Sequence, residues 1–270
     1  VDGAIKLFQR GGGDITGAIV ARCLDADLYE NWTDVSGFLS ADPRIVQNPR
    51  AIGRITFDEM RELSYMGASV LQEEAIFPVR EANIPIQIKN TNRPKDAGTV
   101  IRETADGDTN EHLITGIAGK KDFLAIHVKK AHMSNEVGVI SRALNIVERY
   151  GVSVEHIPTG VDSFGIVVNA SDVKDTVYSI ISDIRREIEP DDITMVDRLA
   201  LVSVVGRNMS RRSGTSGKIF GALGNAGVNI RMITQSSEEI SIIVGVDNAD
   251  FDRTIGVIYN GFVRDEMVSR

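Results

Sequence analysis

The 270-residue sequence contains a single cysteine, Cys23, and only four histidines. One cysteine excludes an internal disulfide framework and is typical of a reducing compartment, so we expect a cytoplasmic protein. The histidines lack the tight spacing of zinc ligands, and we expect no protein-held metal. The sequence also lacks an apolar run of about 18 residues and a charged-then-apolar leader, so we expect no membrane span.

Basic residues are in short supply as well. The chain has 30 Lys and Arg against 38 Asp and Glu, which gives a formal net charge of −8. Because no basic excess attracts phosphates, the composition argues against nucleic acid and anionic membranes as partners. Hydrophobic (42%) and charged (25%) residues occur at ordinary globular levels, and the length allows two or three domains.

Strands and helices alternate along the first third of the chain. Apolar patterns predict strands over 1–9, 27–32 and 84–90 and a helix over 14–26. Thr56, followed three residues later by Glu59, has the capping-box pattern that begins a further helix. This alternation indicates an α/β fold with mostly parallel strands, and the polar stretch 90–112 indicates a connection between domains.

The rest of the chain repeats itself, because "GVSVEHI" (151–157) and "GVNIRMI" (227–233) are nearly the same phrase. Each follows a strand and an amphipathic helix. Each precedes a second alternating strand, at 163–169 and 239–245, and a further helix, at 172–187 and 249–262. The repeated β-α-β-β-α order, often closed by another strand, predicts two ferredoxin-like units.

Three consecutive glycines, Gly11, Gly12 and Gly13, separate the first predicted strand from the first helix, between Arg10 and Asp14. Bare amides at a helix start suit an anion, and Arg10 adds a bidentate contact for a carboxylate or phosphate. Asp14 could cap the helix or contact a substrate ammonium or a metal. A tight turn with an Asp cap remains the alternative, since the stretch matches neither a Walker loop nor G-x-G-x-x-G.

A second polar loop, "WTDVSGFLSADPRIV" (32–46), follows the next strand. Thr33 and Asp34 come at a strand's carboxyl end, where open α/β sheets bind ligands. Asp34 could accept hydrogen bonds from ribose hydroxyls, and Arg44 could meet phosphate. The alternative is a solvated loop with an Asp-Pro turn.

These segments together resemble the aspartate kinases. That family has approximately "GRGGSD-T", "TDVDGVYTADPR" and "LGAKVLHP", and here "QRGGGDIT", "TDVSGFLSADPRIV" and "MGASVLQEEA" stand in the same order. The repeat falls where the family has two regulatory ACT domains. The resemblance implies an α/β amino-acid kinase fold over 1–108, an open, mostly parallel sheet with flanking helices, then two ferredoxin-like βαββαβ ACT domains over 109–190 and 191–270.

The resemblance also implies phosphoryl transfer from ATP, with Mg²⁺, to the β-carboxylate of L-aspartate, the first step toward lysine, threonine and methionine. No tightly bound cofactor is implied. Matching positions place Arg10, Gly11, Gly12, Gly13 and Asp14 on the aspartate and phosphate side. Matching positions on the nucleotide side are Thr33, Asp34, Leu39, Asp42, Arg44, Ser69 and Val70.

Several positions depart from the family pattern. Ser69 replaces a usual lysine, Leu39 a common tyrosine, and Gly13 a serine. The family's opening "KFGGTSV" has no counterpart, so we expect the chain to lack the first part of the kinase domain and not to be a competent kinase as written.

The resemblance further implies a feedback amino acid bound in the first ACT domain. Matching positions are Met133, Glu136, Gly138, Val139 and Ile140 at a helix start, and Ser153, Val154 and Glu155 at a strand end. Lysine is the expected effector, because Glu155 suits a distant ammonium. A homodimer through the ACT domains is also expected. The alternatives are a non-catalytic regulatory subunit of such a kinase and another amino-acid kinase.

Overall fold

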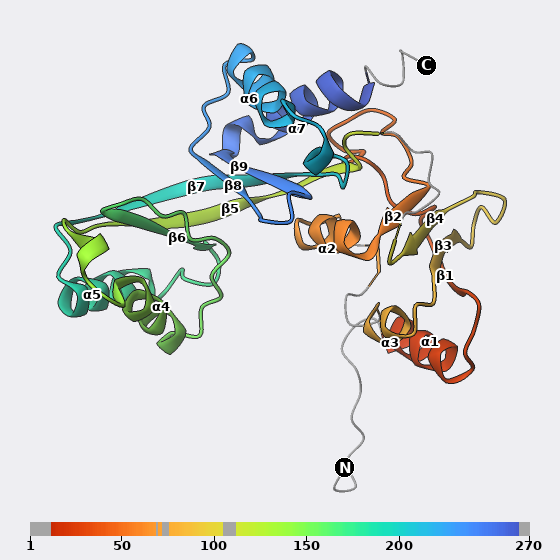
Figure 1. The fold of residues 1–270 in the computed structure, drawn as a ribbon, viewed down its shortest axis with the longest axis horizontal. Helices are drawn as coiled ribbons and strands as arrows, with labels where there is room; N and C mark the ends of the chain where they lie inside the picture. The colour runs from red at the N-terminus through yellow and green to blue at the C-terminus, as the bar shows by residue number, and fades with distance from the viewer. Residues whose placement is uncertain (1–11, 69, 72–75, 105–111, 265–270) are drawn as a thin grey trace, which may run out of the picture.

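The computed structural model describes residues 12–68, 70–71, 76–104 and 112–264 (Figure 1). The predicted strand over 1–9 lies outside them. Two sheets organise the described residues, one in an N-terminal portion (residues 12–104) and one in a C-terminal portion (residues 112–264). No helix among these residues is both long and apolar enough to cross a membrane.

The sheet of the N-terminal portion has the strand order β1-β3-β4-β2 within the described residues. Its strands are β1 (Tyr29–Thr33), β2 (Arg54–Thr56), β3 (Ile86–Asn90) and β4 (Thr99–Arg102). β1 runs parallel to β3 and β2 parallel to β4, whereas β3 and β4 are antiparallel. The mostly parallel α/β sheet is therefore confirmed. The prediction that 90–112 is only a connection is wrong, because β4 lies within it.

Three helices accompany this sheet: α1 (Gly12–Cys23), α2 (Phe57–Tyr65) and α3 (Ile76–Glu81). α1 and α3 lie together at one end of the sheet in Figure 1. The predicted capping box begins α2, since the Thr56 hydroxyl accepts from the Glu59 amide at 3.2 Å and the Thr56 amide donates to Glu59 Oε2 at 3.0 Å. Two backbone groups that a helix start leaves open are thereby satisfied.

The sheet of the C-terminal portion is antiparallel, with the order β6-β5-β7-β9-β8 among the described residues. Its strands are β5 (Gly116–Lys129), β6 (Ser163–Asn169), β7 (Asp192–Val205), β8 (Met232–Gln235) and β9 (Ser241–Asp247). Its helices are α4 (Val139–Arg149), α5 (Val177–Ile188), α6 (Thr215–Asn225) and α7 (Phe251–Ile258). The predicted strand at 151–157 is wrong. The backbone of this segment forms an isolated antiparallel bridge between His156 and Val167 of β6 in place of a regular strand, and Pro158, which has no amide hydrogen, follows.

The two ferredoxin-like units share their long strands. In the first unit, residues 123–129 of β5 pair with β6 and the beginning of β7, and α4 and α5 complete the core. In the second unit, residues 116–120 of β5 pair with the end of β7, and α6 and α7 pack there. The repeat predicted one unit after the other, whereas Leu113, Ile114 and Ile117 join the core of the second unit, so the units interleave.

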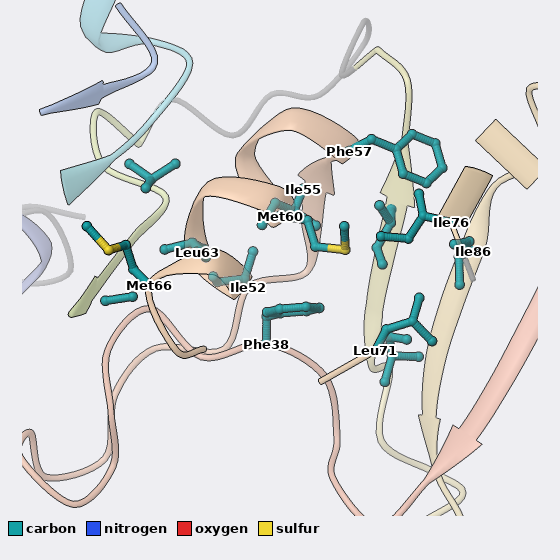
Figure 2. Close-up of a cluster of buried hydrophobic side chains, with 14 of the residues drawn as sticks. Phe38, Ile52, Ile55, Phe57, Met60, Leu63, Met66, Leu71, Ile76 and Ile86 are labelled. Atoms are coloured by element: carbon teal, nitrogen blue, oxygen red, sulfur yellow. The ribbon is translucent and has the colours of Figure 1, made fainter. Parts of the chain in front are cut away.

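α2 lies between the two sheets. Figure 2 shows its side chains Met60 and Leu63 beside Phe38 and Ile52 in the core of the N-terminal portion. The same apolar cluster continues to Leu201 on β7. A methyl group added at Gly116 would lie 3.0 Å from Leu63 Cδ1, so the start of β5 approaches α2 closely.

Candidate functional site

The glycine-rich segment leads into α1. Arg10 and Gly11 lie outside the described residues, whereas Gly12 and Gly13 form the first turn of the helix. Asp14 lies within that turn rather than at a cap, so its carboxylate stands beside the positive end of the helix dipole. This arrangement places an acid at the helix end whose first amides have no acceptor within the helix.

Two residues of β1 hold Asp14, and sequence reasoning missed both. Asn31 Nδ2 donates to Asp14 Oδ1 at 2.9 Å and to Tyr29 Oη at 3.1 Å. Tyr29 Oη donates to the Asp14 carbonyl at 3.1 Å. The available signal was an asparagine at a core-facing position of a predicted strand, since Asn31 is 7% exposed.

Close packing of α1 on β1 depends on a further glycine. A Cβ atom at Gly17 would lie 2.7 Å from Tyr29 Oη, so any side chain there would push the ring away. Burial raises the pKa of Tyr29; the hydrogen bond from Asn31 opposes this change, and the Asp14 charge adds to it. The phenol therefore remains a protonated donor at neutral pH.

Residues at the end of β3 and just after it hold the loop that follows β1. The Thr33 carbonyl accepts from the Thr91 amide at 2.8 Å, and Asn90 Nδ2 donates to Ser36 Oγ at 2.9 Å. Gly37 has a φ of +102°, and a Cβ there would lie 2.2 Å from Thr99 Oγ1. Asp34 is exposed at the mouth of this loop, where its Oδ1 accepts from the Thr33 hydroxyl at 3.3 Å.

Within the described residues, the other predicted nucleotide residues make contacts of their own and none bonds to Asp34 as Thr33 does. Arg44 folds back on Asp42, with its Nη2 2.6 Å from Asp42 Oδ2, and its side chain is 87% exposed. Hydrogen bonds from Arg44 hold the pKa of Asp42 below its usual value. Leu39 forms an isolated bridge with Ala51, and Val70 is half-buried. Ser69 lies outside the described residues.

Glu136, one of the predicted effector residues at the start of α4, forms ion pairs with Lys130 and Arg142. Met133 begins a 3₁₀ turn, and Gly138 caps α4 with a φ of +82°. Glu136 accepts from Arg142 and lies 3.2 Å from Lys130 Nζ through its Oε2. The bond to Lys130, with help from Arg142, lowers the pKa of Glu136. Val139 is buried in the core and Ile140 packs against it.

Ser153, Val154 and Glu155 line a cavity of about 690 Å³ with the second half of α4. The residues at the start of α4 do not line this cavity. The hydroxyl of Tyr65, at the end of α2, donates to the Glu155 carboxylate. The structure thus ties the predicted effector acid to the N-terminal portion, a link that sequence reasoning missed.

A second cavity, of about 420 Å³, lies at the start of α6 in the second unit. Arg212, Gly214 and Thr215 line it from the helix start, and Gln235 and Glu239 from the region of β8 and β9. For the first unit, the sequence predicted a site made of a helix start and a strand end together. In the structure, this combination lines a cavity in the second unit. Neither cavity includes a cluster of three or more metal-ligand side chains, and the same holds for all described residues.

Comparisons with known proteins agree with this architecture. A profile described as the amino acid kinase family matches residues 1–90, and an ACT domain profile matches residues 202–262. The chain is 40% identical over 269 residues to Aspartokinase 3 of Bacillus subtilis, covering 99% of this chain and 59% of that protein. Aspartokinase 1, chloroplastic, of Arabidopsis thaliana is 29% identical, with 96% of this chain and 46% of that protein covered.

Solved structures give the same result. The aspartate kinase of Clostridium acetobutylicum superposes with a TM-score of 0.92 at 51% identity, covering 97% of this chain and 60% of that chain. E. coli aspartokinase III in complex with aspartate and ADP superposes with a TM-score of 0.77 at 25% identity, covering 93% and 56%. The chain thus spans about three fifths of Aspartokinase 3 and of the Clostridium enzyme, and under half of the Arabidopsis protein. Over this span it is similar to the aspartate kinases.

Proposed function

We propose that this chain supplies the aspartate loop, part of the nucleotide site and the regulatory portion of an aspartate kinase. The enzyme transfers the γ-phosphoryl group of MgATP to the β-carboxylate of L-aspartate. The observation that carries the proposal is the bond from Asn31 to Asp14, which joins the start of α1 to β1 just before Thr33 and Asp34. Substrate and nucleotide candidates thereby share one end of the sheet.

Phosphoryl transfer requires positioning and charge neutralisation more than covalent chemistry by the protein. The amides at the start of α1 and the Arg10 guanidinium suit the reacting carboxylate and phosphate. The Asp14 carboxylate suits the substrate's ammonium, and exposed Asp34 suits the ribose hydroxyls. Mg²⁺ enters with the nucleotide as part of the substrate. Support comes from E. coli aspartokinase III, whose structure was solved with aspartate and ADP.

The test uses the full-length enzyme with MgATP and L-aspartate, trapping the acyl phosphate product with hydroxylamine. Arg10→Ala should raise the KM for aspartate far more than that for ATP. Asp34→Ala should raise the KM for ATP far more than that for aspartate. The loss of a charged hydrogen bond costs about 1.5–3 kcal/mol, which corresponds to a change of about 10- to 150-fold in that KM. Absence of aspartate-dependent product, or equal effects of each variant on both substrates, would contradict the proposal.

We also propose that lysine is the feedback effector and that Glu155 pairs with its ε-ammonium. E. coli aspartokinase III was solved with lysine and aspartate. The second copy has Arg231 at the place of Glu155, and that arginine, 3.6 Å from Asp247, would repel an ammonium. One lysine per chain follows. Glu155→Gln should weaken lysine binding at least about tenfold by calorimetry. Unchanged affinity, or two lysines per chain, would contradict this.

A cytoplasmic homodimer completes the proposal. β8 is an edge strand of the five-stranded sheet in the described structure, and its Ile233 is 49% exposed. An exposed sheet edge favours pairing with a second copy. Sedimentation equilibrium of the full-length enzyme should give twice the chain mass, and a monomer at micromolar concentration would contradict it.

A further inference from the structure

We propose that Asn31 and Tyr29 are positioning residues that orient the Asp14 carboxylate toward the ammonium of the amino-acid substrate. This inference rests on the proposed function of Asp14. Neither residue belongs to the two glycine-containing loops from which the site was recognised. Both lie on β1, beneath the helix that carries Asp14.

The donors of Asn31 fix its orientation. An asparagine amide has two N–H donors, and here they serve Asp14 Oδ1 at 2.9 Å and Tyr29 Oη at 3.1 Å. The reverse amide orientation would turn its carbonyl oxygen toward a carboxylate, which repels it. Because Asn31 is 7% exposed, water cannot readily replace either bond. The amide therefore has one stable orientation.

The hydroxyl of Tyr29 secures the other side of Asp14. It accepts from Asn31 and donates to the Asp14 main-chain carbonyl at 3.1 Å, so side chain and backbone are held together. The absence of a side chain at Gly17 permits this approach. The three groups form a closed network between α1 and β1.

The network uses one of the two oxygens of the Asp14 carboxylate. Among the described residues, Asn31 is the hydrogen-bond donor to the Asp14 carboxylate, and it uses Oδ1. Oδ2 is left for a ligand, and a carboxylate oxygen held in place selects a cation with N–H donors. The substrate group with that chemistry is the ammonium of an α-amino acid. Without the network, Asp14 would retain its charge and lose its orientation.

The experiment measures both KM values of the full-length enzyme. Asn31→Leu removes both donors at similar size and should raise the KM for aspartate about tenfold, while the KM for ATP stays within about twofold. Tyr29→Phe removes only the hydroxyl and should raise it about threefold. An unchanged KM for aspartate in both variants would overturn the inference. If Asn31→Leu fails to fold, Asn31→Ala, whose side chain has no donor, replaces it.

Asn90 provides the matched control. It is a buried asparagine on β3, the neighbouring strand, and its amide holds Ser36 instead of Asp14. Asn90→Leu should leave the KM for aspartate within about twofold. An increase equal to that of Asn31→Leu would show a general effect of losing a buried amide and would overturn the inference.

Asp14→Asn separates this inference from the proposed function. If Asp14→Asn leaves the KM for aspartate unchanged, the proposed role of Asp14 fails and the inference fails with it. If Asp14→Asn raises that KM and Asn31→Leu does not, only the inference fails. Combining Asp14→Asn with Asn31→Leu should add nothing to Asp14→Asn alone, because Asn31 acts through Asp14. Additive effects would overturn it.

A swapped pair distinguishes positioning from a structural role. Asp14→Asn with Asn31→Asp keeps one amide and one carboxylate in contact, so thermal stability should recover relative to Asn31→Leu. The KM for aspartate should remain high, because the charge no longer faces the substrate. Recovery of that KM together with stability would overturn the inference.

Discussion

Glu59 is a fully buried carboxylate at the start of α2, held by donors from both portions of the chain. Its Oε1 accepts from Thr115 Oγ1 at 2.6 Å and from the Arg207 amide at 3.0 Å. Its Oε2 accepts from Arg207 Nη1 at 2.8 Å and from the Thr56 amide at 3.0 Å. Burial alone would raise the pKa of Glu59, but these bonds, led by Thr115, outweigh it and lower the pKa.

Replacing Glu59 should therefore destabilise the protein in a pH-dependent way. Glu59→Gln removes the buried charge that Arg207, Thr115 and Thr56 hold, and it should cost about 3 kcal/mol at pH 7, the lower end for a broken buried pair, because Arg207 is 21% exposed. A lowered folded-state pKa adds stability above the unfolded value, and that stability is lost as pH falls through the folded value. The difference between wild type and Glu59→Gln in urea unfolding should thus shrink below about pH 4.5.

Glu81→Gln is the control for this experiment. Glu81 pairs with Arg22 on the surface, with side chains 63% and 49% exposed, and its loss should cost under about 0.5 kcal/mol. A cost for Glu59→Gln as small as this, or one independent of pH, would show that Glu59 is not the buried anion that the contacts indicate.

At the scale of elements, local sequence signals predicted where a helix starts, whereas a strand that depends on tertiary contacts was missed. The Thr56–Glu59 capping box specified the start of α2, because both bonds form within one turn. β4 was missed because it is four residues long, with Val100 and Ile101 as its strongly apolar residues. Such a strand is stabilised by neighbours that pair on both sides, and a single sequence does not reveal them.

The candidate site likewise has residues that local pattern predicted and residues that it missed. The glycines at the start of α1 and the Thr33–Asp34 pair were predicted from local pattern, and the Thr91 amide anchors the second of these segments through the Thr33 carbonyl. Asn31 was not predicted as a site residue, because its role comes from a contact with a helix that starts 19 residues earlier (31 − 12). Long-range hydrogen bonds of this kind have no counterpart in periodicity or turn chemistry.

At the scale of the whole molecule, α2 joins the N-terminal portion to both ferredoxin-like units. Its first turn carries Glu59, bonded to Arg207 beyond the end of β7, and its last residue, Tyr65, donates to Glu155 in the first unit. The first and second units share β5 and β7, so a shift in one strains the other through continuous strands. α2 is therefore the element through which occupancy by the proposed effector would reach the sheet against which α1, with Asp14, packs.

Tyr65→Phe tests this connection in the full-length enzyme. If lysine and Tyr65 compete for the Glu155 carboxylate, removing the hydroxyl should raise lysine affinity about two- to tenfold, the value of one partly exposed hydrogen bond. The ring, whose centroid is 5.2 Å from Lys120 Nζ, stays in place.

Adding Glu155→Gln should abolish the gain in lysine affinity, since no contested carboxylate remains. Tyr178→Phe, on a tyrosine that is 75% exposed on α5, should change nothing. A ligand shifts an equilibrium only by its differential affinity for the two states. If calorimetry shows unchanged or weaker lysine binding in Tyr65→Phe, the Tyr65 contact does not oppose the effector.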